Sequence, residues 1–443
     1  MDRGQREALA LKTIGFAADT PAEAIVLDED AGLTRFTHNA VHQNLAHRNA
    51  SVRIRTLAGG RTGVAATNAL DDASLRAMVA RSREIGAVAP RDDGTAPLVE
   101  HAQPPLPPGA YVEATATATP ERRAGIAADI IATAERNALW AAGYVRTGYS
   151  GITVANSAGA LLSFDRTSCA LNVKQNAADS SGFAEAYAND VAALDGKHAG
   201  DVAADKALRA AAPIAVEPGA WTVILEPAAL GELFSYLAGH FSAQAYDEGS
   251  SFVSGSLGAL CAGKNVTLAD DFAHELHRGM PFDFEGYSRR QMQLVTGGVA
   301  TGVVTDAYWA RRLGRRNTGH GMPAPSPSGP QALHLVVSGG EKNVERLIAE
   351  TKRGLLISRF WYIRPVDQRK TIVTGMTRDG TFLIENGTLG PGVRNMRFNQ
   401  SILEALKYAE FSHGQVRTEG YSYSIALPAV KFERFAFTSL TDF

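Results

Sequence analysis

The 443-residue sequence has little cysteine, no excess of basic residues and no long apolar run. Its two cysteines, Cys169 and Cys261, are too few for a disulfide framework or a cysteine-based zinc cage. With 44 Lys and Arg against 46 Asp and Glu, the net charge of −2 argues against a nucleic-acid-binding protein. No apolar stretch is long enough to predict a membrane span or a secretory signal. We therefore expect a cytoplasmic protein with reduced thiols that contacts neither nucleic acid nor membrane.

The composition that remains is that of an ordinary globular protein, with 45% hydrophobic and 20% charged residues. In the first half of the chain, short strands alternate with helices. Strands are predicted at Ala24–Asp28 and at Ala50–Leu57, where apolar and polar residues alternate. Thr119-Pro120-Glu121 has the residues of a helix start, and we expect that helix to reach about Ala142. This pattern predicts an N-terminal α/β domain over residues 1–212.

The pattern changes near residue 213. Trp221–Leu225 is predicted to form a buried strand, and Glu226-Pro227 begins a helix that we expect to continue to about Ala243. Strands and turns dominate the rest of the chain. The sequence therefore predicts a β-rich C-terminal domain over residues 213–443 and an overall α+β fold.

Three local features could belong to a functional site. His274-Glu275-Leu276-His277 spaces its histidines differently from the HExxH helix of zinc proteases, and we interpret it as a solvated loop or short helix. His240 near a helix end is more typical of a capping or packing residue than of a metal ligand. Phe360, Trp361 and Tyr362 could line a groove, and on a strand at least one of them should face the core.

Longer segments resemble a known family, the TldD/PmbA proteins, and within it the PmbA (TldE) branch. The resemblance covers nearly the whole chain. It is carried by five segments: VAATNALDDASLR at 64–76, SFVSGSL at 251–257, PFDFEG at 281–286, KRGLLISRFWYIR at 352–364 and TRDGTFLIENGTLGPGVRNMRFNQ at 377–400.

The resemblance implies a metallopeptidase assembly in which TldD-type chains hold zinc with an HExxxH helix and a C-terminal cysteine. In this sequence the corresponding helix, 227–243, is degenerate. Ser235 occupies the position of the first histidine of the HExxxH motif, and Tyr236 occupies the position of its glutamate. Only the second histidine of the motif is present, as His240. Residues 412–420, where the cysteine is expected, contain none. A single imidazole cannot hold a catalytic zinc, and a phenol is a poor base at neutral pH.

The resemblance therefore implies a chain without catalytic residues, metal or cofactor of its own, with zinc in a TldD-like partner. Ser235, Tyr236 and His240 become candidates for a substrate cleft, and Tyr236 and His240 would share one helix face. We expect a peptide substrate, a homodimer when the protein is alone, and a heterodimer with the partner.

Two functions stay open at this point. The chain could be a TldE-like subunit of a peptidase that cleaves unfolded peptides or the leaders of modified peptide precursors. Alternatively, it could be a stand-alone peptide-binding or regulatory protein, since older family labels connect such chains with modulation of DNA gyrase.

Overall fold

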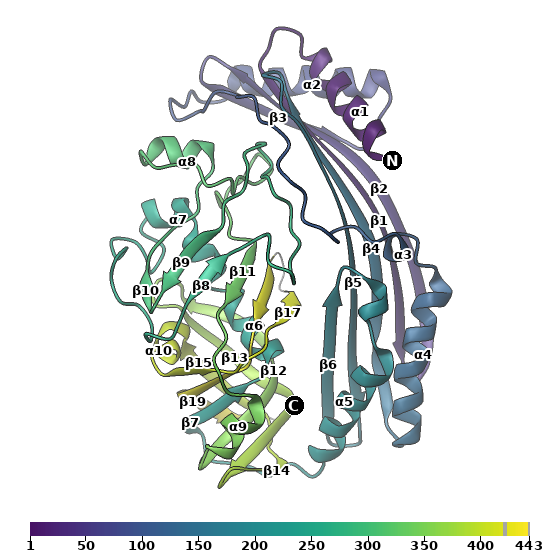
Figure 1. Ribbon diagram of the computed structural model, residues 1–443, viewed down its shortest axis with the longest axis vertical. Coiled ribbons are helices and arrows are strands. Elements are labelled where there is room, and N and C mark those ends of the chain that lie inside the picture. The colour runs from purple at the N-terminus through teal and green to yellow at the C-terminus, as the bar shows by residue number, and fades with distance from the viewer. Residues whose placement is uncertain (420–422, 442–443) are drawn as a thin grey trace.

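The computed structural model describes residues 1–419 and 423–441. The chain folds into two parts that face each other: a long curved sheet carrying helices, and a β-rich part built from the later residues (Figure 1). The predicted α+β class is confirmed. The strands of the curved sheet end by Ala188 and the next strand begins at Gly219. The division into two domains at residues 212 and 213 stays a prediction.

The curved sheet has six antiparallel strands in the order β3-β2-β1-β4-β5-β6. Both predicted strands are present, but β1 and β2 are far longer than the predicted segments and form one hairpin with a turn at His38 and Asn39. The strand bounds are Ala22–Thr37 (β1), Ala40–Ala58 (β2), Arg61–Thr67 (β3), Trp140–Asn156 (β4), Leu161–Asn176 (β5) and Ser181–Ala188 (β6).

Five α-helices accompany this sheet, and α4 packs its apolar residues, such as Ile126 and Ile130, into a cluster with strand residues of β4 and β5. The helix begins at Pro120 as predicted but ends at Arg136, before the expected Ala142. Gly143, just after the expected helix end, instead lies inside β4, where a Cβ atom would come within 2.0 Å of the Asn172 carbonyl oxygen. The bounds are Arg3–Phe16 (α1), Asp72–Val88 (α2), Glu113–Ala116 (α3), Pro120–Arg136 (α4) and Gly196–Arg209 (α5), with a 3-10 turn at Val191–Ala193.

The β-rich part contains two sheets. One has the order β10-β9-β8-β11-β18-β17, and the other has the order β12-β7-β19-β15-β13-β14. Because β12 pairs with both β7 and β13, the second sheet closes into a ring of strands. The strands are Gly219–Leu225 (β7), Leu268–Asp270 (β8), Met292–Thr296 (β9), Val299–Ala300 (β10), His334–Val337 (β11), Arg353–Asp367 (β12), Ile372–Glu385 (β13), Thr388–Gly392 (β14), Met396–Ser401 (β15), Ala409–Phe411 (β16), Val416–Glu419 (β17), Ser424–Leu427 (β18) and Val430–Leu440 (β19).

Short helices connect these strands. They are Pro227–Phe234 (α6), Ala243–Asp247 (α7), Ala307–Arg312 (α8), Val344–Ala349 (α9) and Ile402–Leu406 (α10), with a 3-10 turn at Ala238–Phe241 (η2). Buried aromatic rings of the strand ring, Phe360, Phe398 and Phe435, contact one another at centroid distances of 4.6–5.7 Å. In the part of the chain that the structure describes, we find no helix of a length and apolarity that would span a bilayer.

The junction between the two parts differs in character along its length. Near the loop that carries the PFDFEG segment, Met280 and Phe282 pack against Ile25 and Phe164 of the curved sheet. Ion pairs also join the two parts elsewhere along the junction. They include Arg55–Glu285 (3.2 Å), Arg146–Glu419 (3.2 Å), Lys174–Asp379 (3.1 Å) and Lys206–Glu226 (2.5 Å).

Candidate substrate-binding site

The predicted helix over residues 227–243 begins where expected but is not continuous. Glu226 is its N-cap and Pro227 its first residue, yet α6 ends at Phe234. The Ser235 hydroxyl donates to the Glu232 carbonyl at 2.7 Å, and the amides of Tyr236 and Leu237 bond to carbonyls three residues back. These tighter turns continue into the 3-10 turn η2, so Tyr236 and His240 do not lie on one α-helical face. The expectation of one shared face is wrong.

A pocket of about 500 Å³ opens where α6 ends and meets β12. Two of the three predicted cleft residues, Ser235 and Tyr236, line it, and His240 does not. The complete lining is Glu232, Ser235, Tyr236, Arg359, Trp361, Tyr362, Ile363, Arg364 and Glu419.

His240 is a packing residue rather than part of this pocket. It is only 4% exposed, and its ring lies 5.2 Å from that of Phe252. Burial lowers the pKa of His240 to about 4, so the imidazole is neutral at pH 7. Its own carbonyl accepts a hydrogen bond from the Ser251 hydroxyl at 2.7 Å.

Side chains of α6 and of the turn after it bind main-chain groups of β12 beyond the point where β7 stops pairing with it. The pairing with β7 ends at Ile357. The Tyr236 hydroxyl donates to the Ile363 carbonyl at 2.7 Å, and the Phe360 amide donates to Glu232 Oε2 at 3.0 Å. At these two positions, side chains make the hydrogen bonds to β12 that a neighbouring strand would otherwise make.

Glu232 is an acidic residue of the pocket that sequence reasoning did not select. Burial raises its pKa to about 8, with Glu185 and Asp379 acting in the same direction and Arg359 opposing them. The Arg359 guanidinium lies 3.5 Å from Glu232 Oε1. At neutral pH, Glu232 therefore presents mainly a neutral carboxyl group that can donate a hydrogen bond.

The aromatic run has one buried member and two exposed ones. Phe360 is fully buried, whereas Trp361 is 44% and Tyr362 59% exposed at the pocket. The expectations that the run could line a groove and that one member faces the core are confirmed. Arginines accompany both exposed rings: Arg378 lies 4.8 Å from the Trp361 centroid and Arg364 lies 4.3 Å from that of Tyr362.

The residues that the family resemblance places at zinc-site positions do not fit a zinc ion. The hydroxyls of Ser235 and Tyr236 are bonded to main-chain carbonyls, and His240 is buried against an aromatic ring. Within residues 1–419 and 423–441, no three or more His, Cys, Asp or Glu side chains are grouped so that they could hold a metal. Gly420, at the end of the segment without cysteine, lies outside the described residues. That the purified chain holds no zinc stays a prediction.

The His274–His277 string is a turn next to the β11–β18 sheet, and it is not simply solvated. His277 is fully buried, with its Nδ1 2.9 Å from the Ser424 hydroxyl and its Nε2 3.0 Å from the Leu335 carbonyl. The expectation of a solvated segment is wrong for this residue, because its ring bonds the sheet behind it. His277 lies outside the pocket at α6.

Comparison with known proteins shows which family the chain is similar to. The C-terminal domain of the PmbA/TldA metallopeptidases matches residues 218–439, and domain 1 of the same family matches residues 22–86. A metalloprotease of Methanothermobacter thermautotrophicus is 25% identical over 275 residues, which cover 57% of each chain. An uncharacterised protein of Methanocaldococcus jannaschii is 29% identical over 196 residues, 42% of this chain and 44% of that one. The matches thus span about half the length of these relatives.

Solved structures match over the whole chain. TldE from Thermococcus kodakarensis superposes with a TM-score of 0.87 at 21% identity and covers 98% of this chain and 99% of its own. A Thermotoga maritima protein, described as a candidate modulator of a DNA gyrase, superposes with a TM-score of 0.86 at 18% identity. The match covers 98% of this chain and 100% of the Thermotoga maritima chain. Together with the domain that matches residues 218–439, these likenesses lead to one conclusion. The chain belongs to the PmbA/TldD metallopeptidase family and resembles TldE.

Proposed function

We propose that this protein is a TldE-like, non-catalytic subunit of a heteromeric zinc metallopeptidase. A TldD-like partner supplies the zinc and the general base, and the complex cleaves unfolded peptides or the leaders of modified peptide precursors. This chain contributes a pocket that binds the peptide. Its membership of the metallopeptidase family supports the reaction class, and its likeness to TldE supports its place in that family.

The observation that carries the proposal is the pocket at the end of α6. Ser235 and Tyr236, which stand at two zinc-site positions, line a cavity of about 500 Å³, within the usual size of a ligand site. Two main-chain groups of β12 beside it, the Phe360 amide and the Ile363 carbonyl, are already bonded to side chains. The pocket is therefore proposed to bind side chains of the peptide rather than its main chain.

The test is to co-express the chain with a TldD-like chain that carries HExxxH, then measure zinc content and peptide turnover with and without this protein. We expect zinc to accompany the partner and turnover to require both chains. A TldD-like chain that cleaves peptides equally well alone would contradict the proposal.

A single substitution in the pocket sharpens this test. Tyr236→Ala should change peptide turnover by the complex and leave its zinc content unchanged, because Tyr236 lines the pocket but is not expected to bind the metal. Tyr408→Ala is a matched control, since Tyr408 is 50% exposed and outside the pocket. Unaltered turnover in a folded Tyr236→Ala complex would show that the pocket has no part in catalysis.

The second candidate, a stand-alone regulatory protein, rests on the gyrase description of the Thermotoga maritima relative. With a net charge of −2, this chain gives no support for direct DNA contact. Failure of the protein to associate with any TldD-like chain would favour this candidate.

A further inference from the structure

The most distorted part of the pocket is a β-bulge in β12. The register between β12 and β13 shifts between Trp361 and Arg364. Within this bulge, Tyr362 has a φ of +56°, a left-handed conformation that a bulky residue rarely adopts. Bulges re-aim side chains and are frequent beside functional sites. Here the bulge brings Trp361, Tyr362 and Arg364 into one pocket lining, with both aromatic rings exposed.

Two hydrogen bonds to one carbonyl hold the distorted backbone in place. The Tyr236 hydroxyl and Arg364 Nη1 both donate to the Ile363 carbonyl, at 2.7 Å and 2.8 Å. Ile363 itself is only 6% exposed. The bulge is therefore a positioned element rather than a loose loop, and its exposed side chains have a defined place.

Of the two arginines that line the pocket, Arg359 has carboxylate partners and Arg364 has none among the described residues. Arg359 faces Glu232 at 3.5 Å and Asp379 at 3.7 Å. Glu419 forms ion pairs with two arginines, Arg146 and Arg417. By contrast, no carboxylate of the described residues lies within ion-pair distance of Arg364, which bonds only a carbonyl and stacks on Tyr362.

Together these features define the ligand chemistry of the pocket. A guanidinium without an acid partner favours a carboxylate, which it binds through charge-assisted hydrogen bonds. Exposed aromatic rings beside it offer contact area for neighbouring apolar parts of a peptide. The protonated Glu232 adds a hydrogen-bond donor instead of a repelling charge.

We infer that Arg364, Trp361 and Tyr362 form a subsite for a carboxylate of the bound peptide. The inference rests on the proposed function, because it names the substrate class of the same pocket. The carboxylate belongs either to an acidic side chain or to the C-terminus of the peptide, and the two sources are separable by experiment.

The experiment measures the affinity of the full-length protein for dye-labelled, unstructured peptides by fluorescence anisotropy. One peptide carries an internal Glu, the second carries Gln in its place, and each is made with a free and with an amidated C-terminus. Arg364→Gln is compared with Arg369→Gln, which removes the same charge at an exposed position outside the pocket.

We expect the wild type to bind the carboxylate peptide about ten-fold more tightly than its neutral counterpart. Arg364→Gln should abolish this difference, Arg364→Lys should keep part of it, and Arg369→Gln should keep all of it. A preference for Glu over Gln identifies a side-chain carboxylate, whereas a preference for the free over the amidated end identifies the C-terminus.

Equal binding of charged and neutral peptides by the wild type would overturn the inference, as would equal losses in Arg364→Gln and Arg369→Gln. Failure of this subsite is distinguishable from failure of the proposed function. A complex with the TldD-like chain that cleaves neutral and acidic peptides equally well would retain the proposed function and lose only the carboxylate subsite.

Discussion

At the scale of single residues, Tyr236 shows how a position expected to carry a general base can serve the structure instead. Its hydroxyl donates to the carbonyl of Ile363, which is almost fully buried. Tyr236→Phe removes this donor and should lower the free energy of unfolding by about 1 kcal/mol. Urea denaturation measures the change. Tyr408→Phe, at a half-exposed position, should stay within about 0.5 kcal/mol of the wild type, and equal effects of the two variants would contradict the structural role of Tyr236.

Glu232 makes a contribution to stability that depends on pH. Its pKa is about 8 in the folded protein, above the ordinary value of 4.5. Between these two values the folded state binds more protons than the unfolded state, so this group lowers stability as the pH rises. Glu232→Gln removes the titration. We therefore expect the wild type to lose stability relative to Glu232→Gln as the pH rises from 5 to 8, as measured by denaturation at a series of pH values.

The comparison between the two proteins isolates Glu232 from other groups that titrate in this range. Glu185, for example, has its pKa raised to about 7 by burial, but it is present in both proteins. A difference in stability that is constant from pH 5 to 8 would show that Glu232 titrates normally in the folded state.

The sequence predicted part of the pocket at this scale. Ser235 and Tyr236 were found through the family motif, and Trp361 and Tyr362 through the aromatic run. Glu232 could not be selected, because an acidic residue on a short helix is usually solvated. His240 is the packing residue that its place near a helix end indicates, and it lies outside the pocket because the helix is interrupted after Phe234.

At the scale of elements, periodicity located strands and helices better than their ends. The strand predicted at Ala24–Asp28 covers only part of β1, which continues to Thr37 and buries Thr34 and Phe36 near its far end. Between Glu29 and Leu33 no side chain is fully buried, so the sequence there carries no clear alternation of apolar and polar residues. The helix α1, Arg3–Phe16, was not predicted, since its charged residues break the apolar stripe.

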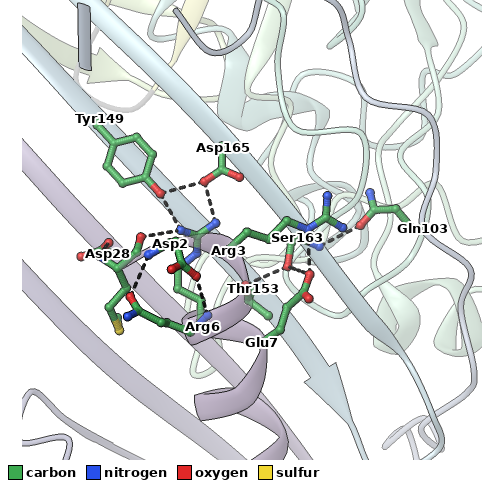
Figure 2. A network of polar contacts seen from close by, with 12 residues as sticks. Asp2, Arg3, Arg6, Glu7, Asp28, Gln103, Tyr149, Thr153, Ser163 and Asp165 are labelled. Atoms are coloured by element: carbon green, nitrogen blue, oxygen red, sulfur yellow. Dashed lines mark hydrogen bonds and ion pairs between the residues drawn. The ribbon is translucent and has the colours of Figure 1, made fainter. Parts of the chain in front are cut away.

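Arg6 explains the docking of α1 on the curved sheet. The side chain is fully buried between the helix and strands β4 and β5, where it contacts Tyr149 and lies 2.6 Å from Asp165 (Figure 2). The Tyr149 hydroxyl also donates to Asp165 at 2.7 Å, which links all three side chains. Arg6, a charged residue among the apolar residues of α1, thus belongs to a buried polar network with Tyr149 and Asp165.

Removing this guanidinium should be costly. Arg6→Ala leaves Asp165 without its buried partner and should lower the free energy of unfolding by about 2–3 kcal/mol, because Asp165 keeps some contact with water. Arg3→Ala is the control: Arg3 is an exposed residue of the same helix, its ion pair with Glu7 is accessible to water, and it should contribute less than about 0.5 kcal/mol. Chemical denaturation of both variants checks the difference, and equal losses would contradict a special role for Arg6.

At the scale of the whole molecule, the order of the strands was beyond the sequence. β7 lies between β12 and β19, strands that follow it by more than a hundred residues. No local pattern contains such pairings, since they are decided by long-range packing. Most of the junction between the two parts could not be predicted either, because three of its ion pairs, Arg55–Glu285, Arg146–Glu419 and Lys174–Asp379, join residues far apart in the chain.

The outer edge of β2 is partly unpaired in the curved sheet. β3 pairs with β2 only from Val52 onward, so the outer edge of residues 40–51 has no strand partner among the described residues. Val41 and Leu45 are 39% and 45% exposed along this stretch. A long uncovered edge is an uncommon feature in a soluble protein unless another chain pairs with it.

We expect a second copy of this chain to cover that edge when the protein is alone. Antiparallel pairing of residues 40–51 with the same residues of the other copy would satisfy both edges through one two-fold axis. Light scattering should then give about 94 kDa, twice the chain mass of 47.0 kDa. Leu45→Lys places a positive charge on this edge in both copies. The two like charges repel each other across the two-fold axis, so the measured mass should shift toward 47.0 kDa. Leu11→Lys, on exposed α1, should leave the dimer intact, and a wild type that stays at the monomer mass at high concentration would contradict the expectation.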